Sequence, residues 1–401
     1  MCQGIKNKIE RLFEMAEISI VVIAYNRPES LKRLMSSLLI ADYQGDEVDL
    51  IISIDYSGRT DVYEIADAVN WPYGKKILIK HEANLGLREH VLTCGDLTDQ
   101  YRGICVFEDD IFASPGFYSF AKQALCRYQL DPKIAGISLY GNSWNQYVDR
   151  PFQPIDDGTD VYFMQVASSW GQIWYREAWC DFRIWLVNKN SRDLVMDGLP
   201  LDVTNWSEKS WLKYHNAYLV ETNRYFVHPR VSLSTNFSDQ GEHALESTTY
   251  QVPILLKAKE NYNFPLLAEG IQYDAFYEYK FSKNIAGINI EDIDISLFGN
   301  KPERKRYRLS VEMRNEKIIK SYGLKLRPIE FNIQFEVAGD DIFLYDTTIS
   351  CAQPSSTYVN RFKRYLYEMR SSNKKDMFLC AMILYFKAMK RKISLIGLWG
   401  K

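Results

Sequence analysis

Three consecutive acids end the apolar run in Ile104-Cys-Val-Phe-Glu-Asp-Asp-Ile111. A short, uninterrupted apolar run is typical of a central parallel strand that is covered on both faces. Ligand sites in open α/β sheets lie just beyond the carboxyl ends of such strands, and hard divalent cations take carboxylate oxygens as ligands. An acidic triplet by itself is more often a solvated loop, so the surrounding sequence has to separate a metal site from a surface turn.

Strand and helix patterns alternate before this triplet. The predicted strands are 18–24, 49–55 and 76–80. The predicted helices are one that starts after Asn26 and has Leu31, Leu34, Met35, Leu38 and Leu39 on one face, one at 62–69, and one that follows 84–88. Asn26 is placed to cap the first helix, with Pro28 in its first turn and Glu29 three residues on. Alternation at this spacing predicts right-handed βαβ units, a parallel sheet and an α/β fold.

Composition excludes several other classes of protein. The net charge of −2 provides no basic field for nucleic acid, and 46% apolar with 25% charged residues is ordinary for a globular chain. The seven Cys have no CxxC spacing, which favours neither a disulfide framework nor a zinc site and fits a reducing cytoplasm. Because the first 17 residues lack an apolar core and no apolar stretch approaches 18 residues, we expect neither a signal peptide nor a spanning helix.

Polar residues follow each predicted strand in an order that resembles a known family. They are Arg27, Asp55, Asn84-Leu-Gly86 and Phe107-Glu-Asp-Asp-Ile-Phe-Ala-Ser-Pro-Gly-Phe-Tyr118. This pattern looks like the nucleotide-sugar half of GT-A glycosyltransferases, and most resembles N-acetylglucosaminyltransferase I and bacterial family 2-like relatives. The resemblance covers roughly residues 17–245. It implies a GT-A fold, a Rossmann-like mostly parallel sheet flanked by helices, and we expect the residues beyond it to form a small C-terminal α+β extension.

The same resemblance implies roles for the strand-end residues. Asp110 would bind Mn²⁺ or Mg²⁺ bridging the donor diphosphate, while Glu108 and Asp109 would contact donor sugar or ribose. Arg27, Asp55 and Asn84 would bind the nucleotide, which is expected to be UDP. Without the resemblance, Asp55 is equally well a turn-capping acid and Arg27 a surface charge at a helix start.

Two further segments are similar to the family's metal and acceptor regions. His243, in the stretch 225–243, resembles a late His that reaches the metal or diphosphate, although a solvated loop His is an equal alternative. The stretch 162–174 is similar to the segment that lines the acceptor side, where Ser168, Ser169 and Trp170 could face the acceptor; core packing is the alternative for Trp170.

The general base is expected near Trp206. The family places an Asp directly after the first Trp of a Trp-Asp-x-x-Trp region, but this chain has Ser207 there. The nearest acid is Glu208, so the assignment of Glu208 rests on a shift of one residue. Asp202 and Asp181 remain competitors for the same role.

The C-terminal part carries a weaker signal. Segments within 304–337, such as Phe331–Val337, alternate in polarity and suggest a small antiparallel β piece of unknown role. Residues 374–392 predict a basic, apolar helix that either lies in a membrane interface or packs in the fold or a dimer. The predicted divisions are a helical lead at 1–17, the GT-A domain at 18–250, a mixed extension at 251–360 and the basic helix at 361–401.

Together these observations predict a metal-dependent glycosyltransferase. Inversion is implied by the resemblance, with transfer of a hexosyl or N-acetylhexosaminyl group from a nucleotide-sugar to a glycan or lipid-linked glycan. We expect a cytoplasmic location, with the C-terminal helix placing the protein on the inner membrane face in one interpretation. A nucleotidyltransferase would need a Gly-rich loop after the first strand, and a haloacid dehalogenase-type phosphatase would need a second acid after Asp55. A non-catalytic nucleotide or sugar binder remains the alternative, because Ser207 occupies the expected base position.

Overall fold

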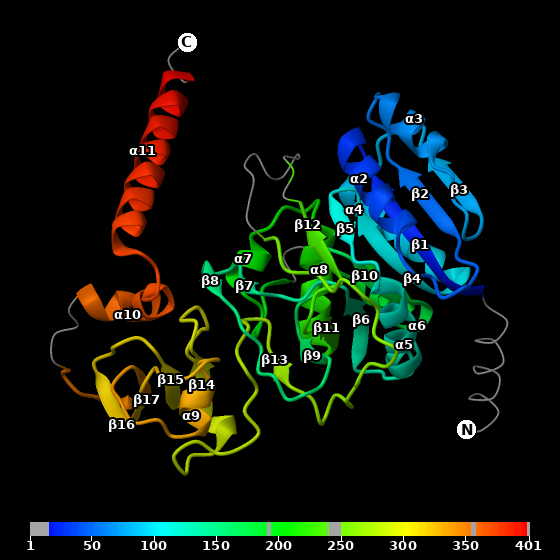
Figure 1. Cartoon of the computed structure of the whole chain (residues 1–401). Helices are drawn as coiled ribbons and strands as arrows, with labels where there is room; N and C mark the ends of the chain where they lie inside the picture. The colour runs from blue at the N-terminus through cyan, green and yellow to red at the C-terminus, as the bar shows by residue number, and fades with distance from the viewer. Residues whose placement is uncertain (1–15, 191–193, 238, 240–249, 354–357, 399–401) are drawn as a thin grey trace, which may run out of the picture. The chain divides into compact units, whose positions relative to one another are not determined.

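The computed structural model describes residues 16–190, 194–237, 239, 250–353 and 358–398. The chain divides into two compact units (Figure 1). Unit 1 consists of Met1–Ile290 with Asn300–Pro302, and unit 2 of Glu291–Gly299 with Glu303–Lys401. The predicted lead at 1–17 falls outside the described residues except for 16 and 17, which belong to the first strand. The predicted divisions at 250 and 360 stay predictions.

A nine-stranded sheet forms the centre of unit 1. The strands of unit 1 are β1 (Ala16–Ala24), β2 (Leu50–Ile54), β3 (Lys76–Lys80), β4 (Tyr101–Glu108), β5 (Ile111–Ala113), β6 (Ile134–Ser138), β7 (Trp144–Asn145), β8 (Arg150–Pro151), β9 (Val161–Met164), β10 (Gln172–Tyr175), β11 (Tyr225–Pro229), β12 (Ser234–Asn236) and β13 (Gln272–Tyr273). The order in the large sheet is β13-β9-β11-β6-β10-β4-β1-β2-β3. β4, β1, β2 and β3 are parallel, β10 is antiparallel to β4 and β6, and β6 and β11 are parallel again.

Helices cover both faces of this sheet (Figure 1). The described helices of unit 1 are α2 (Pro28–Leu39), α3 (Asp61–Ala68), α4 (Leu87–Gly95), α5 (Phe117–Tyr128), α6 (Arg176–Val187), α7 (Leu201–Thr204) and α8 (Trp211–Glu221), with a 3-10 turn at Asp96–Asp99. Val22 of β1 packs in the core that α2, α3 and α5 share, whereas its neighbour Val21 packs with α4, α6 and α8. Because both faces are buried, the central strands are apolar at successive positions. The predicted α/β fold with a large, mostly parallel sheet is confirmed.

The helix start after β1 differs from the prediction. α2 begins at Pro28, and the capping position is Arg27, which makes no side-chain cap hydrogen bond. The prediction that Asn26 caps this helix is therefore wrong. A guanidinium has only donors and cannot accept a hydrogen bond from a helix N–H, so the Arg27 side chain does not cap α2.

A short antiparallel pair brings a distant segment beside the acidic triplet. β12 pairs with β5, which places Asn236 opposite Ile111. Directly after β12, the Phe237 N–H donates to the Asp110 carbonyl (3.0 Å). The residues that follow β12 thus lie beside the carboxyl end of β4.

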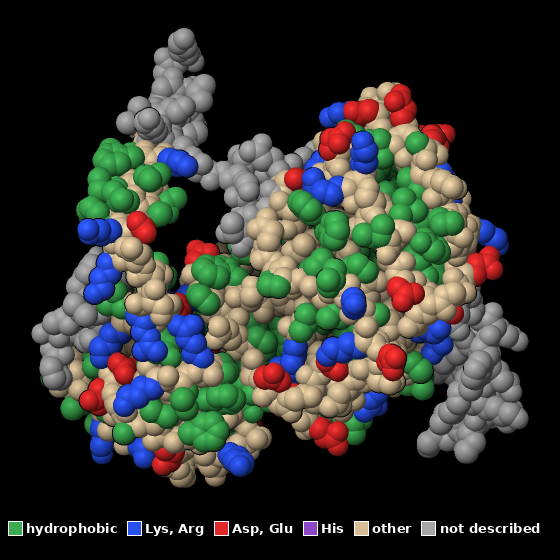
Figure 2. All heavy atoms as spheres, viewed as in Figure 1, with side chains coloured by type: hydrophobic (Ala, Val, Ile, Leu, Met, Phe, Trp, Pro, Cys, Tyr) green, Lys and Arg blue, Asp and Glu red, His purple; other side chains and the backbone are tan. Residues whose placement is uncertain are grey.

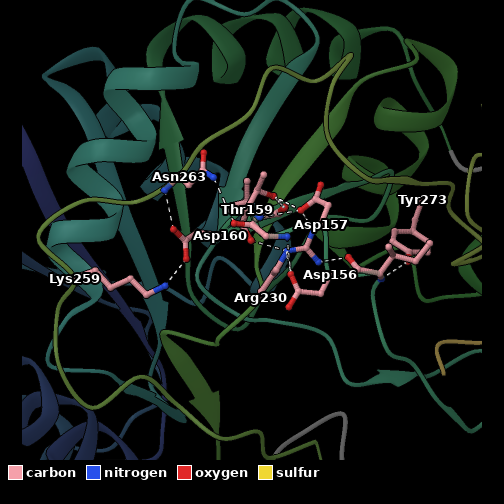
Figure 3. Close-up of polar contacts among 11 residues, drawn as sticks. Asp156, Asp157, Thr159, Asp160, Arg230, Lys259, Asn263 and Tyr273 are labelled. Atoms are coloured by element: carbon pink, nitrogen blue, oxygen red, sulfur yellow. Dashed lines mark hydrogen bonds and ion pairs between the residues drawn. The ribbon is translucent and has the colours of Figure 1, made fainter. Parts of the chain in front are cut away.

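Arg230 fastens a second set of loops to β11 (Figure 3). Its Nε donates to the Thr159 carbonyl (2.7 Å) and its Nη2 to Asp157 Oδ1 (2.7 Å). The neighbouring Asp160 accepts from the Asn263 N–H (2.7 Å) and from the Lys259 ammonium. These acids are paired with cations of the same unit, so we assign the cluster a structural role.

The described residues of unit 2 form a four-stranded sheet and three α-helices. Its elements are β14 (Ile293–Ser296), β15 (Tyr307–Ser310), β16 (Glu316–Tyr322), α9 (Phe331–Gln334), β17 (Ile342–Ser350), α10 (Tyr358–Met369) and α11 (Lys374–Leu398). The strand order is β14-β15-β17-β16, and β17 is antiparallel to both neighbours. The predicted antiparallel piece exists, but Phe331–Val337 is not part of it, since Phe331–Gln334 forms α9. Asn332 explains the difference: its buried side chain bonds the backbone of Lys325, Leu326 and Ile329 and so closes a compact turn.

α11 exposes its apolar side chains. The large exposed ones are Phe378, Leu379, Met382, Ile383, Leu384, Tyr385, Phe386 and Met389 (Figure 2). Among the described residues, no helix is both long and apolar enough to cross a bilayer. The helix predicted over 374–392 is therefore present, and its described side chains are not packed into a core.

Candidate active site

A cavity of about 880 Å³ opens at the carboxyl ends of the parallel strands of unit 1. It is lined by Ile23–Arg27 at the end of β1, Asp55–Ser57 after β2, Asn84–His90 after β3, Glu108–Asp110 at the end of β4, and Glu208, Lys209 and Asp239. The carboxyl edge of parallel strands is where α/β sheets usually bind ligands. Seven of the residues predicted from the sequence meet here: Arg27, Asp55, Asn84, Glu108, Asp109, Asp110 and Glu208.

Arg27 joins the two last acids of the triplet. Its Nη2 donates to Asp109 Oδ1 and its Nη1 to Asp110 Oδ2 (2.9 Å). The side chains are 22% exposed for Arg27, 3% for Asp109 and 15% for Asp110, so water screens these ion pairs only in part. Burial alone would lower the pKa of Arg27, but the two carboxylates raise it above its ordinary value. Arg27 is therefore a permanent cation at the metal site that the sequence predicts.

The triplet is crowded with negative charge. Burial, followed by the Asp110 charge, raises the pKa of Glu108 to about 8, against the opposing effect of Arg27. Burial also raises the pKa of Asp109 to about 6, again opposed by Arg27. Asp109 Oδ2 is buried and has no hydrogen-bond partner. A cation bound here would reduce the repulsion between the carboxylates and would give Asp109 Oδ2 a partner.

We predict that Glu108→Gln stabilises the protein at pH 8. The unfolded chain releases the Glu108 proton near 4.5, whereas the folded chain holds it to about pH 8. The unfolded state thus binds fewer protons in this window, so the wild-type free energy of unfolding falls as pH rises from about 4.5 to 8. Without divalent cations, thermal unfolding should show a gain for the variant of about 1–3 kcal/mol at pH 8 and little at pH 4.5. Equal gains at both pH values, or a gain matched by Glu64→Gln on α3, would contradict this.

Asp55 holds the loop that follows β3. Its carboxylate accepts from the backbone N–H groups of Tyr56 (2.9 Å), Leu85 (2.8 Å) and Gly86 (3.0 Å). Gly86 has φ +78°, a conformation that suits glycine, and directly precedes α4. Asn84 Nδ2 in turn donates to the Tyr56 carbonyl (3.0 Å). Asp55 and Asn84 therefore join the ends of β2 and β3 and shape one wall of the cavity.

Glu208 is held by two residues of α8. Tyr214 Oη donates to Glu208 Oε2 (2.7 Å), and Lys213 Nζ lies 3.4 Å from Oε1. Lys213 is buried and also donates to the Trp206 carbonyl (2.9 Å). The Glu208 side chain remains 61% exposed, so its carboxylate is oriented yet accessible from the cavity.

Three charged lining residues, Arg88, Lys209 and Asp239, are among those that the sequence did not predict for the site. Arg88, in the first turn of α4, lies over the Tyr214 ring (4.1 Å), and its Nε is buried without a hydrogen-bond partner. Asp239 accepts from Ser30 Oγ (2.7 Å) and from Arg33, and Lys209 follows Glu208. Arg88 directly follows the Asn84-Leu-Gly-Leu stretch, so its position beside that motif was an available signal. Asp239 had no comparable signal, because only the β5–β12 pairing brings it here.

Other predicted residues lie elsewhere. Asp202 is on α7 and does not line the cavity, and Asp181 on α6 pairs with Arg224 (2.8 Å). Trp170 packs edge-on against Tyr140 (4.7 Å) and stacks on Tyr250 (5.3 Å), again outside the cavity lining. His243 falls outside the described residues, so its predicted contact stays a prediction.

The donor atoms and charge of the cavity suit a hard divalent cation. Among the residues that the structure describes, seven carboxylates line it against three cations, Arg27, Arg88 and Lys209. A nucleoside diphosphate would be repelled by this surplus, which a divalent cation would reduce. Within the described ranges, no three Asp, Glu, His or Cys side chains converge as a complete metal site. Nucleotide sites commonly supply only one or two carboxylates to Mg²⁺, with phosphates and waters completing the shell.

Comparisons with known proteins find remote structural similarity. No protein-family model matches the chain, and no curated protein matches it significantly. S. aureus TarS 1–349 in complex with UDP-GlcNAc is matched with 14% identity over 58% of this chain and 62% of that one, at a TM-score of 0.37. A second structure of S. aureus TarS 1–349 is matched with 13% identity over 54% of this chain and 59% of that one, at a TM-score of 0.35.

A mannosyltransferase from Pyrobaculum calidifontis in complex with GDP-Man and Mn²⁺ is matched with 12% identity. The match covers 54% of this chain and 57% of the mannosyltransferase, at a TM-score of 0.34. The chain thus spans about three fifths of the length of these solved structures. Because the scores are low, the functional assignment rests on the side chains of this chain's own cavity.

Proposed function

We propose that this protein is a metal-dependent glycosyltransferase that uses a nucleotide-sugar donor. The observation that carries the proposal is the convergence of Arg27, Glu108, Asp109 and Asp110 with Glu208 in one cavity at the carboxyl edge of the sheet. Asp110 would hold Mn²⁺ or Mg²⁺. When bound, this cation would neutralise the diphosphate leaving group as a Lewis acid.

The remaining cavity residues would bind and orient the donor. Asp55 and Asn84 fix the backbone wall on which the nucleotide would lie. The Arg88 guanidinium lies over the Tyr214 ring (4.1 Å) at the cavity wall, and its charge suits it to bind a donor phosphate. Glu108 and Asp109 would accept hydrogen bonds from sugar or ribose hydroxyls. We infer UDP as the nucleotide, following the sequence resemblance.

Glu208 would act as the general base. The carboxylate would take the proton of an acceptor hydroxyl as that oxygen attacks the anomeric carbon, while the bond to the nucleoside diphosphate breaks on the opposite face, with inversion. Tyr214 and Lys213 hold both Glu208 oxygens, which keeps the base in one orientation. The acceptor would be a hydroxyl of a glycan or lipid-linked glycan, and the transferred group a hexose or N-acetylhexosamine.

Release of UDP from a panel of UDP-sugars, with Mn²⁺ and with a chelator, tests this function. We expect Mn²⁺-dependent release with at least one donor, increased by a glycan acceptor. Tight UDP binding without turnover for any donor would instead support the alternative of a non-catalytic nucleotide or sugar binder.

We further propose that unit 2 brings the enzyme to the inner, anionic face of a membrane. Lys and Arg outnumber Asp and Glu in this unit by 20 to 13, although the whole chain has a net charge of −2. Figure 2 shows Lys and Arg gathered on unit 2 and apolar side chains gathered on α11. Basic side chains near an anionic surface contribute about 1 kcal/mol each, and an apolar helix adds burial in the interface.

Removing residues 374–401 should release the protein from anionic vesicles, while turnover of a water-soluble acceptor survives. Co-sedimentation at low and high salt measures the binding. Phe378→Asp with Leu384→Asp is a milder test, because both side chains are exposed (64% and 65%) and no core depends on them. Val187→Asp, at an 82% exposed site on α6, is the matched control and should bind vesicles normally. If the helix variants change the oligomeric state and leave vesicle binding intact, α11 is an association helix.

A further inference from the structure

The Arg27 guanidinium bridges the carboxylates of Asp109 and Asp110, the second of which is the proposed metal ligand. We propose that Arg27 competes with the divalent cation for Asp110, so that metal and donor diphosphate bind cooperatively through the transfer of Arg27 from carboxylate to phosphate. This inference rests on the proposed metal site. It adds a regulatory role to a residue that the sequence resemblance associates only with nucleotide contact.

Competition follows from charge and distance. Arg27 Nη1 lies 2.9 Å from Asp110 Oδ2, so a cation on this carboxylate would stand close to a second positive charge. The ion pairs are largely shielded from solvent, where like charges repel more strongly than in water. A guanidinium that bridges two carboxylates is also held tightly. If a metal ion displaced Arg27 from Asp110, the partly buried positive charge of Arg27 would lose a partner.

The other oriented carboxylates of the cavity cannot readily receive Arg27. Both oxygens of Asp55 accept from backbone N–H groups of its own loop. Asp239 is bonded by Ser30 and Arg33, and Glu208 by Tyr214 and Lys213. A diphosphate in the same cavity would offer new anionic oxygens. Arg27 would then be paired again, and Asp110 would be released to the metal.

Thermodynamic linkage makes the effect measurable without catalysis. If UDP takes Arg27 away from Asp110, UDP strengthens Mn²⁺ binding, and Mn²⁺ strengthens UDP binding by the same factor. Part of this factor comes from direct contact between Mn²⁺ and phosphate and does not depend on Arg27. The part that depends on Arg27 should disappear when residue 27 carries no charge.

The test is a Mn²⁺ titration of the full chain, in which the electron paramagnetic resonance signal reports free Mn²⁺. In the absence of nucleotide, Arg27→Met should bind Mn²⁺ about tenfold more tightly than the wild type, within the range of about 5–150-fold typical of coupled sites. The tightening of Mn²⁺ binding by UDP should be smaller in Arg27→Met by a similar factor. Arg27→Lys, which keeps the charge but has no fork, should lie between the two proteins.

Arg33→Met is the matched control. Arg33 is on α2, which follows Arg27, and pairs with the cavity acid Asp239, so its removal changes the local charge equally without touching Asp109 or Asp110. It should alter Mn²⁺ affinity by less than about threefold, a change worth under 1 kcal/mol. Thermal unfolding establishes whether each variant is folded. If Arg27→Met does not fold, the Mn²⁺ affinity of Arg27→Lys, compared with that of the wild type, decides the question.

The outcomes separate the inference from the proposed function. Unchanged or weaker Mn²⁺ binding by Arg27→Met, or an equal gain in Arg33→Met, would overturn the competition. Absence of Mn²⁺ binding by every protein, with and without UDP, would remove the metal site and the inference with it. Tighter Mn²⁺ binding by Arg27→Met together with no donor turnover by the wild type would support the competition and reject the transferase.

Discussion

Asp110→Asn is expected to abolish metal-dependent binding and turnover of the nucleotide-sugar and to leave the protein folded. Asp110 lies at the end of β4 with a 15% exposed side chain, and an amide of the same size opens no cavity there. Arg27 would keep its bond to Asp109. Because Lewis-acid stabilisation is worth several kcal/mol, we expect turnover to fall by about 10³-fold or more.

Mn²⁺-dependent UDP-sugar binding by calorimetry and UDP release would measure this loss, with thermal unfolding as the test of folding. Asp239→Asn is the matched control, since it neutralises another carboxylate of the same cavity that Ser30 and Arg33 already engage. Near-normal metal-dependent turnover by Asp110→Asn would show that the metal is held by other residues.

Glu208→Gln should lower glycosyl transfer by about 10²–10⁴-fold, the range for loss of a general base. Donor binding should change little, because Gln keeps the size of the side chain and can still accept from Tyr214. Single-turnover transfer together with UDP-sugar affinity separates the two effects. Tyr214→Phe, which removes the 2.7 Å hydrogen bond but leaves the carboxylate, should lose less activity than Glu208→Gln.

Two other acids serve as controls for this assignment. Asp202 does not line the cavity, and Asp181 pairs with Arg224, so Asn at either position should retain transfer. If Asp202→Asn or Asp181→Asn shows the selective loss instead, the base is not Glu208 and the shift of one residue after Trp206 is not real.

Two local features differ from their predictions for the same physical reason. Alternation over seven residues predicted a strand at Phe331–Val337, but the pattern is too short to exclude a turn of helix, and the contacts of the Asn332 side chain favour one. Asn26 has a suitable side chain for capping, yet the helix starts one residue later than that role requires. Both depend on which of several local conformations the surrounding fold stabilises.

The sequence by itself determined the strand–helix alternation of the first half and the position of the acids at strand ends. Apolar runs at β1, β2 and β4 encode burial on both faces, and polar residues directly after parallel strands must emerge at one edge of the sheet. This is why six of the predicted site residues, those at the ends of β1 to β4, line one cavity, whereas the seventh, Glu208, comes from the loop before α8.

Only the tertiary structure decided how these side chains pair. Arg27 and Asp109 are 82 residues apart, and Ser30 and Asp239 are 209 apart, so their contacts follow from strand order and from the β5–β12 pairing. The orientation of Glu208 by Tyr214 and the placement of Arg88 on the same ring need α4 and α8 to lie side by side. Local sequence patterns report which face of an element is buried, whereas contacts between distant side chains depend on how the elements pack, and periodicity does not encode that packing.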